Sequence, residues 1–563
     1  MNKLIGRILA TEKTPTIIDE FHFWTNSGCR LSAFDIVRVQ RGDGSLTYGV
    51  IENISHITDA QSFLTNFISS DFGDVDLDGP TIRVGMNYVK AKVSYNDKNI
   101  YTPVHNNDRV YLASAEEIMF ALGLRDVENP LVCGSLKMYE GTEDEIILPV
   151  NLNSKFILGP EGAHLNISGI SGLAAKTSYA MFLMKSIQDQ YLANAESGDS
   201  VAFVIFNVKG SDLMAIDRDN DFDNDPKKKE RILKEYADIG LSANPFRDVK
   251  YYIPHYDDKS SKTSSYLSKD DIDKYTRDGQ LLRYKYLYEY DKESIEMMFS
   301  NIDDTSQTME AIIGKIVDDR DPDFGGIKTW TNFLDEVSER TLKGSGSTKG
   351  SNEISVMSWR KFKRIINKTM RDDAMFADGL SPAKNECRLQ QEIKKIKKNE
   401  VHVIDIAKLS EDKQAFVFGD TLRTIYNLKL GEYDGESGVA PPSRIVVFID
   451  ELNKYASKDV PKSSPILREL LDVTERGRSL GVVLFGAEQF RSAIHPRITG
   501  NCSTHAYGRT NSIETSTKDY GSLPNTYKNM LTRLEQGEYL VQNPIFRSLL
   551  KVSFPRPIYK QFK

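Results

Sequence analysis

Two segments far apart in the sequence carry the residue types needed to bind and split a nucleoside triphosphate. Residues 168–178 read Ser-Gly-Ile-Ser-Gly-Leu-Ala-Ala-Lys-Thr-Ser, and they stand between an apolar strand pattern and an apolar helix pattern. A loop of small residues before a helix N-terminus offers backbone N–H groups to phosphate. A lysine at its end reaches the terminal phosphates, and a following hydroxyl can ligate magnesium. The segment predicts a phosphate-binding loop.

The residues predicted to bind nucleotide all come from this loop. They are Gly169, Gly172, Ala175, Lys176, Thr177 and Ser178. The loop departs from the usual GxxxxGK[ST] pattern, because six residues separate Gly169 from Lys176 and Ala175 stands at the place of the last glycine. Taken alone, the segment leaves ATP binding and an ordinary strand-to-helix turn as equal alternatives.

The second segment is an apolar strand pattern that ends in two adjacent carboxylates. Residues 444–452 read Arg-Ile-Val-Val-Phe-Ile-Asp-Glu-Leu. At the end of such a strand, Asp450 can hold magnesium together with Thr177, and Glu451 can orient and deprotonate an attacking water. A buried strand that leads into two solvated acids is the alternative. The two segments together, in this order, favour an ATP-hydrolysing site.

A third segment, residues 474–489, places two arginines before an apolar strand and a glutamine after it. Arg476 and Arg478 are candidates for the guanidinium that stabilises transition-state charge on the γ-phosphate, which in ring ATPases often comes from the neighbouring subunit. Gln489 is a candidate sensor of the γ-phosphate or of the attacking water. The alternative for the arginines is favourable placement at a helix C-terminus.

The elements that must position these residues change in character along the chain. Residues 1–110 show short period-two patterns separated by turns, which indicates a small closed barrel or sandwich, and 111–150 form a connector that opens with a helix capped by Ser114. Residues 151–215 and 400–563 alternate strand and helix patterns, as an α/β core does. Residues 216–399 predict a mostly helical insertion into that core.

Seven strands are predicted for the α/β core, most of them nearly continuous apolar runs. They are 164–168, 201–208, 401–406, 444–449, 481–485, 503–508 and 538–542. Such runs are typical of strands buried on both faces of a parallel sheet. In the insertion, helices are predicted over 295–317, 330–342 and 359–370, with a Gly/Ser-rich linker at 341–350.

Composition argues against a membrane-spanning protein, a secreted protein and a histidine-based metal site. A chain of 563 residues with 27% charged residues and no run of about 18 apolar residues is an ordinary multi-unit protein with no membrane span. The N-terminus lacks a signal-peptide pattern, and the four cysteines are far apart, so we expect a protein of the reducing cytoplasm. The histidines show no metal-ligand spacing.

Charge limits the expected contact with nucleic acid. The net charge of −7 argues against a protein that simply coats DNA, but leaves local contact open. Two basic runs, 359–364 and 394–398, are either solvated helix faces or contacts to DNA phosphates.

The order of the motifs resembles the HerA family of hexameric ATPases, which is related to FtsK. The resemblance rests on the phosphate loop, Ile-Asp-Glu-Leu at 449–452, Glu-Arg-Gly-Arg-Ser-Leu-Gly-Val at 475–482, Gly-Ala-Glu-Gln at 486–489 and the segment 495–511. It covers most of the chain outside the insertion. It implies a RecA-like parallel-sheet P-loop ATPase core preceded by a β-barrel.

The same resemblance implies roles and partners. Lys176 and Thr177 would bind nucleotide, Asp450 would lie on the magnesium side, Glu451 would be the base, Gln489 the sensor, and Arg478 or Arg476 would contact phosphate. Asp212 matches the family loosely. The cofactors would be ATP and Mg²⁺, and the assembly a homo-hexamer.

Three functions remain open, and the resemblance implies the first two of them. The first is an ATP-driven translocase that acts on double-stranded DNA with an effector subunit, in antiphage defence. The second is an ATPase scaffold that assembles and activates a nuclease or NAD-consuming effector. The third is a coupling ATPase for DNA export, against which the missing membrane segment counts.

Overall fold

The computed structural model describes residues 3–26, 28–69, 84–172, 175–194, 199–257, 263–304, 306–342, 354–371, 373–432 and 440–562. Residues 173–174 of the predicted phosphate loop and 343–350 of the predicted linker lie outside these ranges. The chain divides into two compact units. One comprises Met1–Asn153 with Arg509–Phe554, and the other comprises Ser154–Gly508 with Pro555–Lys563.

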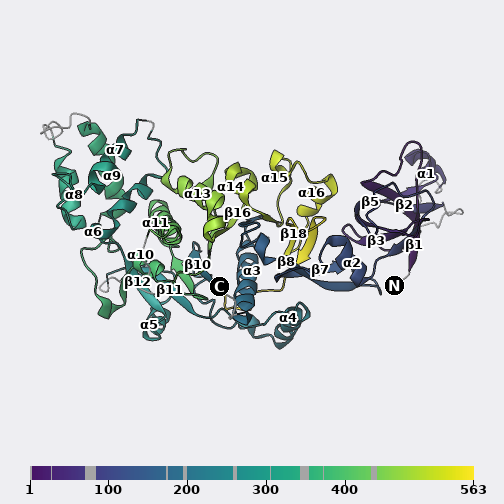
Figure 1. Cartoon of the computed structure of the whole chain (residues 1–563), viewed down its shortest axis with the longest axis horizontal. Helices are drawn as coiled ribbons and strands as arrows, with labels where there is room; N and C mark the ends of the chain where they lie inside the picture. Colours follow the sequence, from purple (N-terminus) through teal and green to yellow (C-terminus); the bar gives the residue numbers. More distant parts are fainter. Residues whose placement is uncertain are drawn as a thin grey trace. The chain divides into compact units, whose positions relative to one another are not determined.

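A closed barrel of antiparallel strands begins the first unit (Figure 1), with the strand order β1-β2-β5-β4-β3-β6. The strands are β1 (Leu4–Ile8), β2 (Glu20–Thr25), β3 (Ile36–Gln40), β4 (Leu46–Thr58), β5 (Gly85–Asn96) and β6 (Arg109–Leu112). Closure pairs the outer strands, since β1 also pairs with β6. The barrel, not the sandwich, is therefore the outcome for the N-terminal β region.

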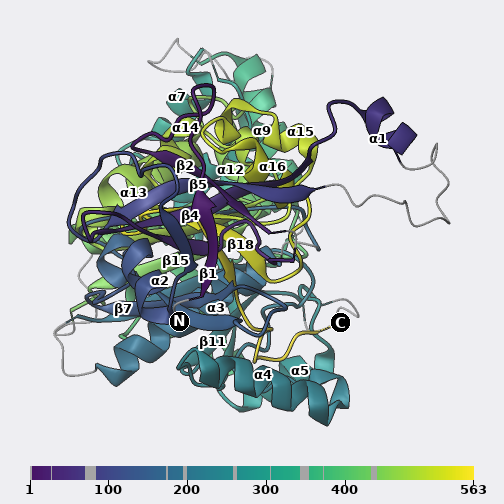
Figure 2. The ribbon, with the colours of Figure 1, turned by 90° about the vertical axis from the view of Figure 1, so that its right-hand side faces the viewer.

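Helix α1 (Phe63–Ser69) follows the long strand β4 and stands away from the barrel strands (Figure 2). Its large apolar side chains Phe63, Leu64, Phe67 and Ile68 are all exposed, Phe63 at 97%. The described part of the chain leaves this apolar face uncovered.

The rest of the first unit contains four antiparallel strands in the order β18-β19-β7-β8. They are β7 (Pro130–Met138), β8 (Ile146–Asn153), β18 (Glu538–Gln542) and β19 (Leu550–Ser553). Residues 538–542 form the predicted strand, but it pairs antiparallel with β19 and belongs to the unit that contains the barrel. The helices are α2 (Ala115–Leu122), α15 (Ser512–Thr515), η8 (Lys518–Tyr520) and α16 (Asn525–Leu531). Ser114 caps α2 with the predicted capping box.

A parallel sheet forms the centre of the second unit, with the order β13-β12-β11-β14-β10-β15-β16-β9-β17. Its strands are β9 (Leu165–Ser168), β10 (Val201–Asn207), β11 (Val249–Pro254), β12 (Leu281–Lys285), β13 (Glu386–Arg388), β14 (Val401–Asp405), β15 (Arg444–Asp450), β16 (Val482–Glu488) and β17 (Thr504–Tyr507). This arrangement confirms the predicted α/β fold class with a RecA-like core. The order places β16 between the strand of the phosphate loop and the strand of Asp450.

Helices cover both faces of this sheet, which is why its strands are apolar throughout. They are η2 (Ser154–Phe156), α3 (Lys176–Ala193), α11 (Glu411–Leu430), α12 (Asn453–Ala456), α13 (Pro465–Leu480), η7 (Arg491–Ala493) and α14 (Pro496–Asn501). Val204, Phe206 and Val447 share one hydrophobic cluster with α11, α13 and the insertion. The buried side chains of α3 lie outside that cluster, so α3 covers the opposite face.

The insertion after β10 is mostly helical, but it also supplies strands β11, β12 and β13, which the sequence did not predict and which extend the parallel sheet. Its helices are η3 (Phe222–Asn224), α4 (Pro226–Asp238), α5 (Lys269–Arg277), α6 (Tyr288–Asp291), η4 (Lys292–Phe299), α7 (Thr308–Val317), α8 (Trp330–Glu339), α9 (Val356–Met370), η6 (Pro382–Lys384) and α10 (Leu389–Lys394).

The single helix predicted over 295–317 is wrong. The chain breaks between η4 and α7, where the carboxylate of Asp304 accepts a 2.7 Å hydrogen bond from the Met309 backbone N–H at the start of α7. Such side-chain capping favours a new helix start over a continuous helix. No helix among the described residues is long and apolar enough to cross a membrane.

Two glycines that end helices of the core allow a matched test of packing at the sheet. Gly431 after α11 and Gly481 after α13 both have positive φ, of 79° and 81°. A Cβ at Gly481 would lie 2.0 Å from the Ser443 carbonyl oxygen, whereas a Cβ at Gly431 would meet nothing within 4 Å.

We predict that Gly431→Ala costs about 1–2 kcal/mol, the cost of a left-handed non-glycine residue. Gly481→Ala should cost clearly more, because the backbone of the β15 start must also move. Urea unfolding of the two variants, followed by circular dichroism, measures the difference. Equal losses would contradict the close approach at Gly481.

Candidate nucleotide site

The predicted site residues gather at one edge of the parallel sheet, where strands β9, β15 and β16 all end. Gly169 follows β9 and its N–H donates a 3.1 Å hydrogen bond to the carbonyl of Glu488, the last residue of β16. Helix α3 begins at Lys176 with its N-terminus at this edge, after Ala175 in a left-handed conformation. A helix N-terminus at the end of a parallel strand is a favourable place for phosphate.

Lys176 is nearly buried and its Nζ is held inside the loop. It donates hydrogen bonds to the Gly169 carbonyl oxygen at 2.8 Å and to Ser171 Oγ at 3.1 Å. Burial lowers the pKa of Lys176, although the charges of Asp450 and Glu488 oppose this effect. An ammonium group already surrounded by loop oxygens is placed to receive the terminal phosphates of a nucleotide.

Thr177 and Asp450 meet across the site, although 273 positions separate them in the sequence. Thr177 Oγ1 donates to Asp450 Oδ2 at 3.0 Å. Magnesium binds hard oxygen ligands and commonly uses one or two protein groups together with substrate phosphates. This hydroxyl and carboxylate fit such an ion, even though the described residues contain no cluster of three or more His, Cys, Asp or Glu side chains.

Glu451, next to Asp450, is held between two lysines. Its Oε1 lies 2.6 Å from Lys209 Nζ, and its Oε2 lies 2.6 Å from Lys454 Nζ. Burial alone would raise the pKa of Glu451, but the hydrogen bonds and charges of the two lysines outweigh it and lower the pKa. Glu451 also has a φ of 59°, and strained backbone of this kind is common at active sites.

The end of β16 brings a further acid into the site. Glu488 is fully buried, and neither of its carboxylate oxygens has a hydrogen-bond partner among the described residues. Burial raises its pKa to about 8, while the charges of Arg491 and Lys176 oppose the rise. Gln489, the predicted sensor, follows directly after β16 and is half-buried.

The structure does not bring Arg476 and Arg478 to this edge. Both lie exposed near the C-terminal end of α13, just before β16 begins, and Arg476 lies 4.0 Å from Asp472. Strand β16 has 7 residues and separates them from the phosphate loop by about 20 Å. Within one subunit these arginines therefore do not reach the bound phosphates.

Three charged side chains of the site were missed in the sequence. Lys209 follows β10, Lys454 lies in α12, and Glu488 ends β16. Lys209 and Glu488 lie at the ends of apolar strands that reach the nucleotide edge, and Lys454 lies three residues beyond Glu451. Their positions relative to predicted strand ends were the sequence signal that could have assigned them to the site. Burial raises the pKa of Asp212, the residue that matches the family loosely, and the positive charge of Lys209 opposes this rise.

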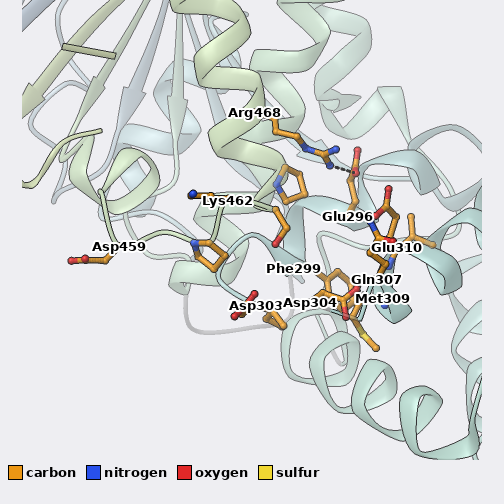
Figure 3. Close-up of a pocket in the computed structure, with 15 residues that line it drawn as sticks. Glu296, Phe299, Asp303, Asp304, Gln307, Met309, Glu310, Asp459, Lys462 and Arg468 are labelled. Atoms are coloured by element: carbon orange, nitrogen blue, oxygen red, sulfur yellow. Dashed lines mark hydrogen bonds and ion pairs between the residues drawn. The ribbon is translucent and has the colours of Figure 1, made fainter. Parts of the chain in front are cut away.

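A groove of about 660 Å³ lies elsewhere in the same unit, between η4 and α7 on one side and the start of α13 on the other (Figure 3). Its lining includes Phe299, Asp304, Lys462 and Arg468, and Arg468 lies 3.6 Å from Glu296. None of the residues that line it belongs to the phosphate loop or to the Asp450–Glu451 pair, so it is separate from the candidate site.

Comparison with known proteins gives structural likeness but no close relative. No protein-family model matches the sequence, and no curated protein matches it. The bacterial conjugative coupling protein TrwB, in an unbound form, is 12% identical with a TM-score of 0.41 over 74% of this chain and 89% of that chain. VirB4 of Thermoanaerobacter pseudethanolicus is 9% identical with a TM-score of 0.41, over 76% of this chain and 96% of that chain.

A further structure, the plasmid coupling protein TrwB in complex with ADP and Mg²⁺, is 12% identical with a TM-score of 0.36, over 70% of this chain and 78% of that chain. Likeness of this extent does not transfer a function to this chain.

Glu488 makes the stability of the chain depend on pH. Its carboxyl binds a proton up to a pH of about 8 in the folded chain, but only up to its ordinary value near 4.5 when unfolded. Between these values the folded state holds one proton more, so stability falls as pH rises, by about 1.4 kcal/mol per pH unit.

We predict that Glu488→Gln removes this contribution. Urea unfolding of wild type and Glu488→Gln at pH 5.5, 6.5 and 7.5 should show the variant gaining relative stability at each step upward. A constant difference between the two proteins across this range would contradict a protonated Glu488.

Proposed function

We propose that this chain is an ATP hydrolase that works as a ring-forming motor on DNA. The observation that carries the hydrolase proposal is the hydrogen bond between Thr177 and Asp450 beside the buried Lys176. It joins a helix N-terminus, a lysine, a hydroxyl and a carboxylate at the end of parallel strands, which is the set of groups that nucleotide hydrolysis needs.

The residues divide the chemistry among them. The loop N–H groups and Lys176 would bind the phosphates, and the oxygens of Thr177 and Asp450 would hold magnesium, which would neutralise charge on the phosphates. Glu451 orients the attacking water and accepts its proton. Lys209 and Lys454 each pair with one oxygen of Glu451 and lower its pKa, so Glu451 is a weaker base while both ion pairs are in place.

The placement of the arginines supports a ring assembly. Arg476 and Arg478 lie at the far edge of the sheet from the subunit's own loop, so their use in hydrolysis requires a second subunit. A head-to-tail interface repeated by a closing rotation makes a ring. We propose a homo-hexamer that processes double-stranded DNA with an effector protein in antiphage defence. The four cysteines are free in the structure, in keeping with a cytoplasmic protein.

A second candidate is an ATPase scaffold that assembles and activates a nuclease or NAD-consuming effector without moving DNA. The ion pairs at Glu451 favour it, since a base weakened at rest by two lysines suits an ATPase that turns over only when a partner rearranges the site. The two candidates differ in whether DNA passes along the ring.

We predict that Lys176→Ala weakens nucleotide binding, because the phosphates lose their ammonium partner. Glu451→Gln should keep binding but lose turnover by about a hundredfold or more, the usual contribution of a positioned base. Fluorescent-nucleotide binding and phosphate release measure the two effects. Lys462→Ala, at the separate groove, is the matched control and should change neither. Turnover within twofold of wild type in both site variants would exclude the hydrolase.

We predict that Arg478→Ala lowers turnover on the order of a thousandfold, as loss of an arginine finger does. Nucleotide affinity should change far less, because the charge acts mainly in the transition state. When Arg478→Ala subunits are mixed with Glu451→Gln subunits, some interfaces regain an intact pair and activity should partly return. No recovery, in rings that mass photometry shows to be mixed, would remove Arg478 from the reaction; Arg476→Ala is tested in parallel.

A further inference from the structure

Helix α9 of the insertion has an unusual charge for this protein. The net charge of the chain is −7, yet α9 contains five cations and no acid. The cations are Arg360, Lys361, Lys363, Arg364 and Lys368. None of them contributes to the nucleotide site described above.

Four of the five cations share one side of α9, because the other side is fixed in the core. Trp359, Phe362, Ile366 and Met370 are buried. The Phe362 ring stacks on Phe299 with centroids 5.1 Å apart, and the Trp359 ring stacks on Phe324 at 5.6 Å. With 3.6 residues per turn, Arg360, Lys361, Arg364 and Lys368 point away from these aromatic contacts, whereas Lys363 lies beside the buried face. This rigid packing presents the basic face to the surface.

Arg360, Arg364 and Lys368 are exposed and form a row along that face. They are four residues apart, so successive cations are about 6 Å apart along the helix axis. Lys368 is paired with Asp412 at 2.6 Å but its side chain remains 73% exposed. Among the described residues, Lys361, Lys363 and Arg364 have no carboxylate partner.

Helix α4 in the same insertion is also rich in cations, but unlike α9 it contains acids among them. It also contains five cations, but three acids alternate with them, and Arg231 pairs with Glu235 at 3.7 Å. A mixed surface of this kind neutralises itself. The basic face of α9 instead leaves positive charge that an external anion with many charges can neutralise.

The position of α9 relates this face to the nucleotide edge. The Lys368–Asp412 pair joins the C-terminal end of α9 to the first turn of α11, which follows strand β14. β14 ends at the same edge of the sheet as the strands that carry Asp450 and the phosphate loop. The basic row therefore begins at the edge where hydrolysis is proposed to occur.

We propose that the basic face of α9 grips the sugar-phosphate backbone of duplex DNA. Each strand of the duplex carries a charge about every 3.4 Å, which gives a row of cations an unbroken line of partners. Arginine adds bidentate hydrogen bonds to phosphate oxygens. An acidic protein surface is the other class of partner, but such surfaces mix both signs, as α4 does. This proposal rests on the proposed function in one respect: a motor that acts on DNA must bind DNA.

The experiment measures equilibrium binding of the full chain to a fluorescently labelled duplex of 30 base pairs, by anisotropy across a series of NaCl concentrations. It is carried out in the Lys176→Ala background, so that the result does not depend on hydrolysis. The test variant is Arg360→Gln/Arg364→Gln/Lys368→Gln. The matched control is Lys227→Gln/Lys229→Gln/Arg231→Gln on α4, which removes the same number of charges.

The α9 variant should bind at least tenfold more weakly at about 0.1 M salt. The slope of log affinity against log salt should become shallower by about 0.9 for each phosphate that the variant no longer neutralises. The α4 control should match the parent, and Arg364→Lys should retain most of the affinity. Duplexes of unrelated sequence should bind equally, because phosphate contacts carry no sequence information.

Unchanged affinity and slope in a folded α9 variant would overturn the proposal, and so would an equal loss in the α4 control. A change in assembly mass without a change in DNA binding would assign the face to an acidic protein surface and would also overturn it. Circular dichroism and thermal unfolding establish that the variants are folded. Loss of hydrolysis in Lys176→Ala leaves this measurement intact, so failure of the motor proposal and failure of the grip are distinguishable.

Discussion

The function of this protein depends on one constraint of parallel sheets: every strand must end at the same edge. Residues that lie hundreds of positions apart become neighbours without any contact between the intervening segments. The hydroxyl of Thr177 and the carboxylate of Asp450 meet in this way, and Lys209 and Glu488 reach the same edge from strands on either side of β15. A small shift of one strand along its neighbour would separate these groups. Because the helices packed on both faces of the sheet hold the strands in register, they position the site as well as stabilise the fold.

The parts of the site that could be read from sequence are those with a local signature. Asp450 and Glu451 stand at the end of one apolar strand pattern, and Lys176 and Thr177 follow the loop after another; parallel pairing brings the two strand ends to one edge. Lys454 carries no such pattern, because its role comes from one turn of chain after the strand. The place of Arg478 before a parallel strand was predicted, but the sequence left open whether it acts within its own subunit, and the length of β16 excludes that.

The fold shows the same division between local and non-local information. The capping box at Ser114 is local and was predicted, whereas strands β11 to β13 were hidden in a region whose helical patterns dominate. The strand at 538–542 was recognised from its apolar run, but its antiparallel partner β19 decides which unit it joins. The middle of the 295–317 pattern failed because a carboxylate at Asp304 starts a new helix there.

The strands that the insertion adds to the sheet affect how this protein can be dissected. Because β11 pairs with β14, and β12 and β13 continue the ladder, the insertion is part of the hydrogen-bonded sheet. A truncated chain that joins residue 215 to residue 400 would leave β14 with a row of unpaired backbone groups along a flat apolar strand. Such edges recruit other chains and promote aggregation. A soluble minimal core would need to retain β11 to β13, or carry charged substitutions along the exposed side of β14, so the insertion cannot be treated as a detachable accessory.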